Sequence, residues 1–158
     1  MNKWFYINAC MLVLVLWNIL NYPSFPSLPV HILFGGLGAG FFLFNWTRHA
    51  VFSTIRDTPE RRKKIKFANL SKKAMPFHRW TGTTALILIV IHGIYVIQRF
   101  GFAWRHFKLL SGVIAGIVLA VLVATGWIRR YRPVRIWRRA HLYLALILFF
   151  LLSIHLLL

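Results

Sequence analysis

The sequence has 158 residues, 59% of them hydrophobic and 16% aromatic, and its 20 Lys and Arg face two acidic residues, Asp57 and Glu60. This is the composition of a membrane protein. A net charge of +18 would otherwise favour a nucleic-acid partner, but the apolar background argues against one. Cys10 is the one cysteine, so an intrachain disulfide is excluded, and we expect it to fill space on a helix.

Five apolar stretches of about 20 residues predict transmembrane helices. In chain order they are 4–22, 29–47, 80–98, 109–128 and 140–158. The first is long for a signal peptide and lacks a small-residue cleavage site, so we interpret it as a retained span. Because the membrane interior offers no water to backbone polar groups, these spans must be helices. The sequence predicts an all-α membrane protein, a single five-span bundle over residues 1–158.

The distribution of Lys and Arg predicts the orientation of the bundle. Ten lie in 48–79, six in 129–139 and one at Lys3, whereas the opposite connections hold three, Arg99, Arg105 and Lys108. Short basic loops stay in the cytoplasm. The N-terminus and the basic loop 48–79 are therefore expected in the cytoplasm, the C-terminus outside, and membrane lipid around the spans.

Small residues mark expected packing faces. Gly36 and Gly40 form a Gly-x-x-x-Gly step in the second span, and small residues recur every four positions in the fourth span at Gly112, Gly116, Ala120 and Ala124. Such steps let helix backbones approach closely. We expect them to serve packing rather than chemistry.

Two predicted spans each carry two histidines fourteen residues apart, His78 and His92 in the third and His141 and His155 in the fifth. Fourteen helical residues end about 40° short of four turns, so both histidines of a span share a face, ~21 Å apart along the axis. Both spans run outward, which makes His78 level with His141 and His92 level with His155. The pattern predicts two bis-histidine haem sites stacked across the membrane, with these four side chains as axial ligands of the haem iron.

Neighbouring residues suit the same interpretation. Gly82 lies on the face of His78 and leaves room for a macrocycle, and Arg79, Arg138 and Arg139 lie beside the inner ligands, where guanidinium groups can bind haem propionates. The sequence has no Cys-x-x-Cys-His motif. We therefore expect two noncovalent b-type haems.

Other interpretations stay open. Single membrane histidines are commonly hydrogen-bond partners between helices, which would suit a non-redox scaffold or anchor subunit. A quinol-oxidising cytochrome b subunit would carry similar histidines. A tetrahedral zinc site is disfavoured because the ligands split into two levels. His31, His49 and His106 lie at span ends or in a loop, and we expect structural or interfacial roles for them.

Two motifs carry a family resemblance. His78-Arg79-Trp80-Thr81-Gly82 with His92, followed by Trp137-Arg138-Arg139-Ala140-His141 with His155, resembles the ferric reductase-like transmembrane domain superfamily. This superfamily includes ferric reductases, NADPH oxidases and the haem membrane subunit of the bacterial methionine sulfoxide reductase system. The resemblance implies a dihaem electron-transfer protein of a bacterial plasma membrane, passing electrons to an extracytoplasmic acceptor.

Two family features are missing from the sequence. Members commonly have a sixth span and a cytoplasmic flavin and nicotinamide domain, whereas this sequence stops at Leu158 and has no Gly-x-Gly-x-x-Gly fingerprint after a strand. Either the chain continues beyond this sequence, or the electron donor is a separate flavoprotein, reduced flavin or quinol. We expect an oxidoreductase component with no catalytic residue of its own.

Overall fold

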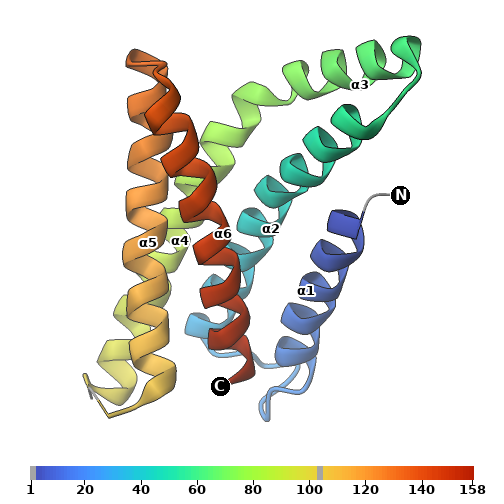
Figure 1. The fold of residues 1–158 in the computed structure, drawn as a ribbon. Helices are drawn as coiled ribbons and strands as arrows, with labels where there is room; N and C mark the ends of the chain where they lie inside the picture. The colour runs from blue at the N-terminus through green and yellow to red at the C-terminus, as the bar shows by residue number, and fades with distance from the viewer. Residues whose placement is uncertain (1–2, 103–104) are drawn as a thin grey trace.

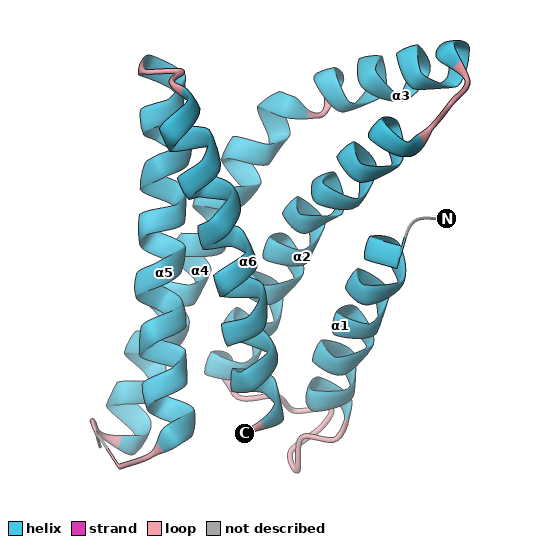
Figure 2. Cartoon of the chain, viewed as in Figure 1, coloured by secondary structure: helices cyan, strands magenta, loops and turns pink. Residues whose placement is uncertain are grey.

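A computed structural model describes residues 3–102 and 105–158. These residues form six helices and, within those two ranges, no strand (Figures 1 and 2). The helices are α1 (Lys3–Leu20), α2 (Val30–Asp57), α3 (Arg61–Lys73), α4 (Met75–Phe100), α5 (Phe107–Tyr131) and α6 (Arg135–Leu157). All but α3 are long and apolar enough to cross a membrane, which confirms the predicted all-α bundle with five spans.

Prolines set several helix boundaries. α2 begins directly after Pro29, Pro76 lies in the first turn of α4, and Pro133 separates α5 from α6. A proline lacks the N–H that a helix interior needs, but the first turn has no use for it. These breaks place the helix ends within a few residues of the predicted spans, except around the basic segment.

The basic segment 48–79, expected as a loop, is mostly helical. α2 continues to Asp57, α3 follows after Pro59, and α4 already begins at Met75. Lys, Arg, Ala and Leu all favour helix, so the charged residues extend the helices beyond the apolar spans. Residues 61–70 of α3 are all exposed, and only Ser71 in its last turn is buried, so this helix projects from the bundle and is not part of its core.

The bundle is built from two tightly packed helix pairs. α2 packs most extensively on α4, and α5 on α6, while α1 packs on α2. The core lies between these pairs and includes Leu43 and Trp46 of α2, Leu119 of α5 and Phe149 of α6. The rings of Trp46 and Phe149 stack with centres 4.9 Å apart. Such close packing matters because lipid gives helices no hydrophobic reason to associate.

The predicted Gly-x-x-x-Gly step contributes to this packing at one of its two positions. A Cβ on Gly36 would lie 2.7 Å from Ile19 Cδ1 of α1, so the absence of a side chain lets α1 and α2 meet. A Cβ on Gly40 would meet nothing within 4 Å. The step therefore holds α1 through Gly36 alone.

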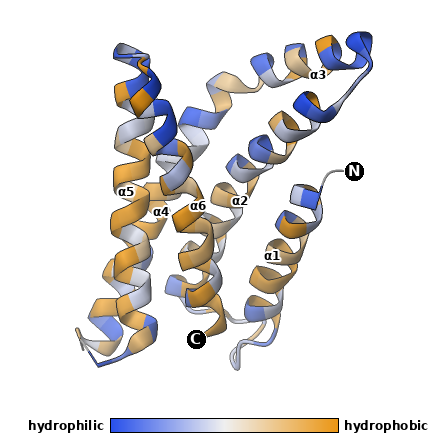
Figure 3. Ribbon diagram, in the orientation of Figure 1, coloured by the Kyte–Doolittle hydropathy of each residue, from blue (hydrophilic) through white to orange (hydrophobic). Residues whose placement is uncertain are grey.

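The two ends of the bundle differ in polarity. Hydrophilic residues gather at the end that holds α3 and the α5–α6 connection, and the middle of the bundle is apolar (Figure 3). The α1–α2 and α4–α5 connections and the C-terminus lie at the opposite end (Figure 1). The basic segments 48–79 and 129–139 thus share one end, called here the basic end.

Candidate functional site

Four histidines form two pairs between α4 and α6. The ring centres of His78 and His141 are 6.2 Å apart, with the ring planes at 78°. Those of His92 and His155 are 6.4 Å apart, with the planes at 86°. In the part of the chain that the structure describes, α4 and α6 make no extensive backbone contact, so the rings reach across a space between the two helices.

The inner pair, His78 and His141, is held by neighbouring helices. His78 Nδ1 donates a hydrogen bond to Asn45 Oδ1 of α2 over 2.8 Å, and Thr81 Oγ1 donates to the same oxygen over 2.8 Å. His141 Nδ1 donates to the Leu122 carbonyl of α5 over 3.1 Å and lies 3.0 Å from Thr125 Oγ1. Each ring is therefore fixed by a helix that does not carry it.

The outer pair, His92 and His155, repeats this arrangement. His92 Nδ1 donates to the His31 carbonyl of α2 over 2.6 Å. His155 Nδ1 donates to the Lys108 carbonyl over 3.1 Å and lies 3.0 Å from Ser111 Oγ of α5. Again α2 holds the ring from α4, and α5 holds the ring from α6.

These hydrogen bonds fix the tautomer of all four rings. Carbonyl and amide oxygens only accept, so each Nδ1 must carry a hydrogen. In a neutral imidazole the free lone pair then lies on Nε2. A histidine that ligates a metal typically has this arrangement, with one nitrogen donating to a carbonyl and the other free to bind.

The supporting residues follow the same spacing as the histidines. On α2, His31 and Asn45 are fourteen residues apart, and on α5, Ser111 and Thr125 are fourteen apart. The spacing of His78 to His92 and of His141 to His155 is thus matched on both neighbouring helices. The same fourteen-residue spacing therefore occurs on all four helices, and it produces two similar sites at two depths.

Glycines make room for three of the four rings. A Cβ on Gly35 would lie 2.8 Å from His92 Nδ1, and one on Gly112 would lie 2.9 Å from His155 Cε1. A Cβ on Gly126 would lie 3.3 Å from His141 Cε1. Gly112 is one of the small residues that recur every four positions in the fourth span and were predicted to serve packing. It has a second role, because it accommodates the ring of His155.

A cavity adjoins the inner pair. Its empty space is about 560 Å³, part of it open to the surface, and its lining includes both inner histidines, Asn45, Gly82 and Trp127. Arg79 also lines it. Of the residues expected from sequence to contact a haem, Gly82 and Arg79 thus lie on this cavity.

The pairs fit a haem iron better than a tetrahedral metal. Two imidazoles on opposite sides of one iron, with metal–nitrogen distances of ~2 Å and each ring centre ~1 Å behind its nitrogen, have centres ~6 Å apart. Both observed separations agree with this value. Within residues 3–102 and 105–158, no three His, Cys, Asp or Glu side chains lie close enough to share an ion. The histidines are therefore suited to a planar cofactor with two axial ligands.

Besides Arg79, two arginines that were not expected from the sequence lie near the inner pair. Arg48 of α2 and Arg129 of α5 are close enough to act electrostatically on both His78 and His141. Arg48 Nε is buried without a hydrogen-bond partner among the described residues. Arg138 lies in a separate hollow at the α5–α6 connection, and Arg139 is exposed.

Arg48 and Arg129 could not be predicted from the apolar pattern, because the predicted spans end at residues 47 and 128. Both arginines lie one residue beyond those ends. The helices themselves continue past them, to Asp57 and Tyr131, so both arginines belong to the same helices that hold the rings of the inner pair.

Of the remaining histidines, His31 and His49 pack within the bundle and His106 is exposed. His31 is buried and binds His92 through its carbonyl, while its ring meets Tyr22 and Phe100 edge-on. His49 stacks on Trp46 with ring centres 5.0 Å apart. His106 is exposed at the start of α5.

A family model matches most of the chain. The model of the family described as "Ferric reductase like transmembrane component" matches residues 34–152, which include α4 and α5 and most of α2 and α6. No curated protein and no solved structure matches significantly. The matched range contains His78, His92 and His141 and ends three residues before His155.

Proposed function

The chain belongs to the ferric reductase-like transmembrane component family, and from this premise we propose that it carries electrons across a membrane through two noncovalent b-type haems. The observation that carries the proposal is the repeated site geometry. Two pairs of histidines have Nε2 available and ring separations that suit one iron each. A haem iron held by two such nitrogens accepts and releases one electron.

The chain's own residues would bind and orient the two haems. His78 and His141 would ligate the inner haem, His92 and His155 the outer one. Asn45 and Thr125 keep the inner rings in the correct tautomer, and Nδ1 hydrogen bonds of this kind also raise the basicity of the ligating nitrogen. The two sites would lie ~21 Å apart along the helices. An electron would therefore cross the membrane in shorter steps, with one haem as an intermediate stop for the other.

Positive charge near the inner pair favours a haem with ionised propionates there. Arg48 and Arg129 both act on the inner histidines, and the chain's two carboxylates lie elsewhere, at the connection between α2 and α3. Partly buried like charges are unfavourable unless an anion lies near them. We assign the propionate contacts to Arg48 and Arg129, with Arg79 on the cavity as a third candidate.

The proposed direction runs from the basic end of the bundle to the opposite end. Lys and Arg gather at the end with α3 and the α5–α6 connection, which the positive-inside rule places in the cytoplasm. Electrons would enter at the inner pair from a separate donor and leave at the outer pair to an extracytoplasmic acceptor. The chain is then the membrane component of an oxidoreductase.

Vesicles that contain ferricyanide test this proposal. With the haem-loaded protein in the membrane and dithionite outside, entrapped ferricyanide should be reduced much faster than in empty vesicles. A variant with all four histidines replaced by Gln should behave like empty vesicles. Equal rates with the wild type and this variant, or a colourless wild-type protein from haem-replete cells, would contradict the proposal and favour a scaffold subunit.

A further inference from the structure

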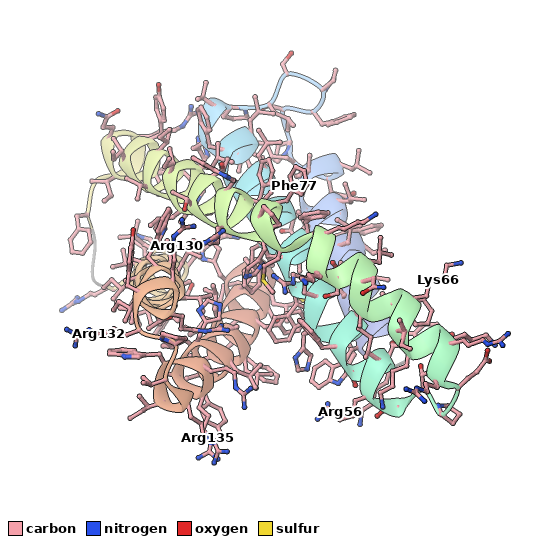
Figure 4. All side chains as sticks on the ribbon, turned by 90° about the horizontal axis from the view of Figure 1, so that it is seen from above. Arg56, Lys66, Phe77, Arg130, Arg132 and Arg135 are labelled. Atoms are coloured by element: carbon pink, nitrogen blue, oxygen red, sulfur yellow. The ribbon has the colours of Figure 1, made fainter. Side chains whose placement is uncertain are left out.

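Helix α3 lies at the basic end and runs crosswise to the spans. In Figure 1 it extends sideways at the level of the α5–α6 connection. In Figure 4, which looks onto the basic end, α5 is seen end-on whereas α3 is seen along its length. A helix with this orientation follows the membrane surface instead of crossing the membrane.

The charge of α3 is concentrated and exposed. Seven of its thirteen residues are Lys or Arg, and all seven are exposed. The chain's two carboxylates, Asp57 and Glu60, both precede this helix, and Glu60 binds Lys63 over 2.7 Å. Residues 57–73 nevertheless keep a net charge of +5. The helix therefore carries far more positive charge than the chain itself can neutralise.

One side of α3 forms a basic stripe that faces away from the rest of the bundle. The stripe consists of Arg62, Lys66 and Lys73, whose spacing of four and seven residues places the side chains within about 40° of one another around the helix. Ser71, the one buried residue of α3, follows Arg62 by nine residues and so lies about 180° from it. The side of α3 that packs is thus opposite to the basic stripe.

Exposed apolar side chains flank the basic stripe. Ile65 is 52% exposed and Leu70 64%. Helix geometry places them about 60° and 80° to either side of Arg62. Water is an unfavourable environment for such side chains, whereas the boundary between lipid headgroups and acyl chains accepts them. A cationic stripe with apolar neighbours is typical of helices that bind to a membrane surface.

The charges within α3 also call for an external anion. Arg61, Arg62 and Lys63 occupy its first turn, where the helix dipole favours negative charge. Arg62 and Lys66 are like charges one helical turn apart, an arrangement that destabilises a helix. An anionic membrane surface beside the helix would offset both effects, because it attracts each Lys and Arg that lies near it.

We propose that α3 lies on the membrane surface at the basic end and binds the headgroups of anionic phospholipids through Arg62, Lys66 and Lys73. The positive-inside rule explains why these residues stay on one side of the membrane, but it requires no lasting contact with lipid. An acidic soluble protein is the other partner that such charge suits. The orientation of α3 along the membrane and its exposed apolar residues favour the lipid. The proposal does not depend on haem binding.

Spin-labelled lipids test this contact in the full-length protein. In phosphatidylcholine vesicles, the wild type should immobilise spin-labelled phosphatidylglycerol at least about twofold more strongly than spin-labelled phosphatidylcholine, as the electron paramagnetic resonance spectrum shows. The triple variant Arg62→Gln/Lys66→Gln/Lys73→Gln should lose most of this preference. Gln has a helix propensity like that of Lys and Arg, so α3 should stay helical, and circular dichroism checks this.

A matched control removes the same charge from the other connection of the basic end. Arg130, Arg132 and Arg135 are exposed at the α5–α6 connection (Figure 4). The variant Arg130→Gln/Arg132→Gln/Arg135→Gln should keep most of the preference for phosphatidylglycerol. An equal loss in both triple variants would overturn the proposal, because the charge would then act without a specific contact at α3.

Salt gives a second measurement that needs no substitution. Ions screen the attraction between Lys or Arg and lipid headgroups, so the wild-type preference should fall at about 1 M salt, where the screening length is about 3 Å. A preference that does not fall, or that is absent from the wild type, would overturn the proposal. Retention of the full preference by the α3 variant would also overturn it, and would leave the basic stripe to an acidic soluble partner.

Discussion

Thr125 on α5 holds the ring of His141 on α6, with Oγ1 3.0 Å from Nδ1. The Thr125 hydroxyl donates to the Leu122 carbonyl over 2.7 Å, so its oxygen is free to accept from the ring. Ser111 repeats this relationship with His155, fourteen residues earlier on α5. Two hydroxyl groups of α5 therefore orient two histidines of α6 in the same way at two depths.

Asn45 supports the inner site in a way that can be tested separately. Replacing Asn45 with Leu removes the oxygen that accepts from His78 Nδ1 and leaves the ring without an orienting partner. We expect inner-haem affinity to fall roughly 10–100-fold, the usual effect of losing such a partner, with the outer haem unchanged. Haem titration of the purified variant measures this, and unchanged binding of both haems would refute the role of Asn45.

Gly112 supports the outer site because its missing side chain leaves room for the ring of His155. The Gly112→Ala variant places a methyl group 2.9 Å from His155 Cε1, so the ring must move and outer-haem binding should fall. Gly40→Ala is the matched control, because a Cβ there meets nothing within 4 Å. Optical spectra should show one haem lost in the first variant and none in the second. Loss in both would point to general disruption of the bundle.

His31 contacts the outer site through its backbone rather than its ring. The His31 carbonyl accepts from His92 Nδ1, and a substitution keeps that carbonyl in place. We therefore expect His31→Leu to retain two haems with nearly unchanged spectra. If this variant loses the outer haem, the imidazole of His31 takes part in ligation and the assigned outer pair is wrong.

Arg48 should tune the inner haem electrostatically. Removing its positive charge in Arg48→Met destabilises the state with the added electron, so the inner midpoint potential should fall by on the order of 50 mV. Arg62→Met on α3 is the control and should leave both potentials in place. A spectroscopic redox titration measures them, and a shift confined to the outer haem would contradict the proposed position of Arg48.

The fold could largely be predicted from the sequence because its strongest determinants are local. Five apolar stretches of membrane length lead directly to five helices, and the observed spans include α4 and α6 with their histidines. The helical state of 48–79 was less evident. A charge-rich segment has no apolar period, and its helices are set by propensity and by the breaks at Pro59 and Pro76.

The residues that hold the histidine rings by hydrogen bonds were harder to predict. Asn45, Ser111 and Thr125 are ordinary polar residues in membrane helices, and their roles depend on which helices become neighbours. One signal was available in the sequence. Ser111-Gly112 and Thr125-Gly126 repeat with the same spacing as the histidines, and a search for that period in all spans would have found them.

Haem stoichiometry tests most directly the proposal that one chain holds two haems at two levels. A pyridine haemochrome assay of the wild type should give two b-type haems per chain. His92→Gln should give one, with the inner-haem potential retained, because His78 and His141 remain intact. A wild-type protein with fewer than two haems, or a His92→Gln variant that loses the inner haem, would contradict the account.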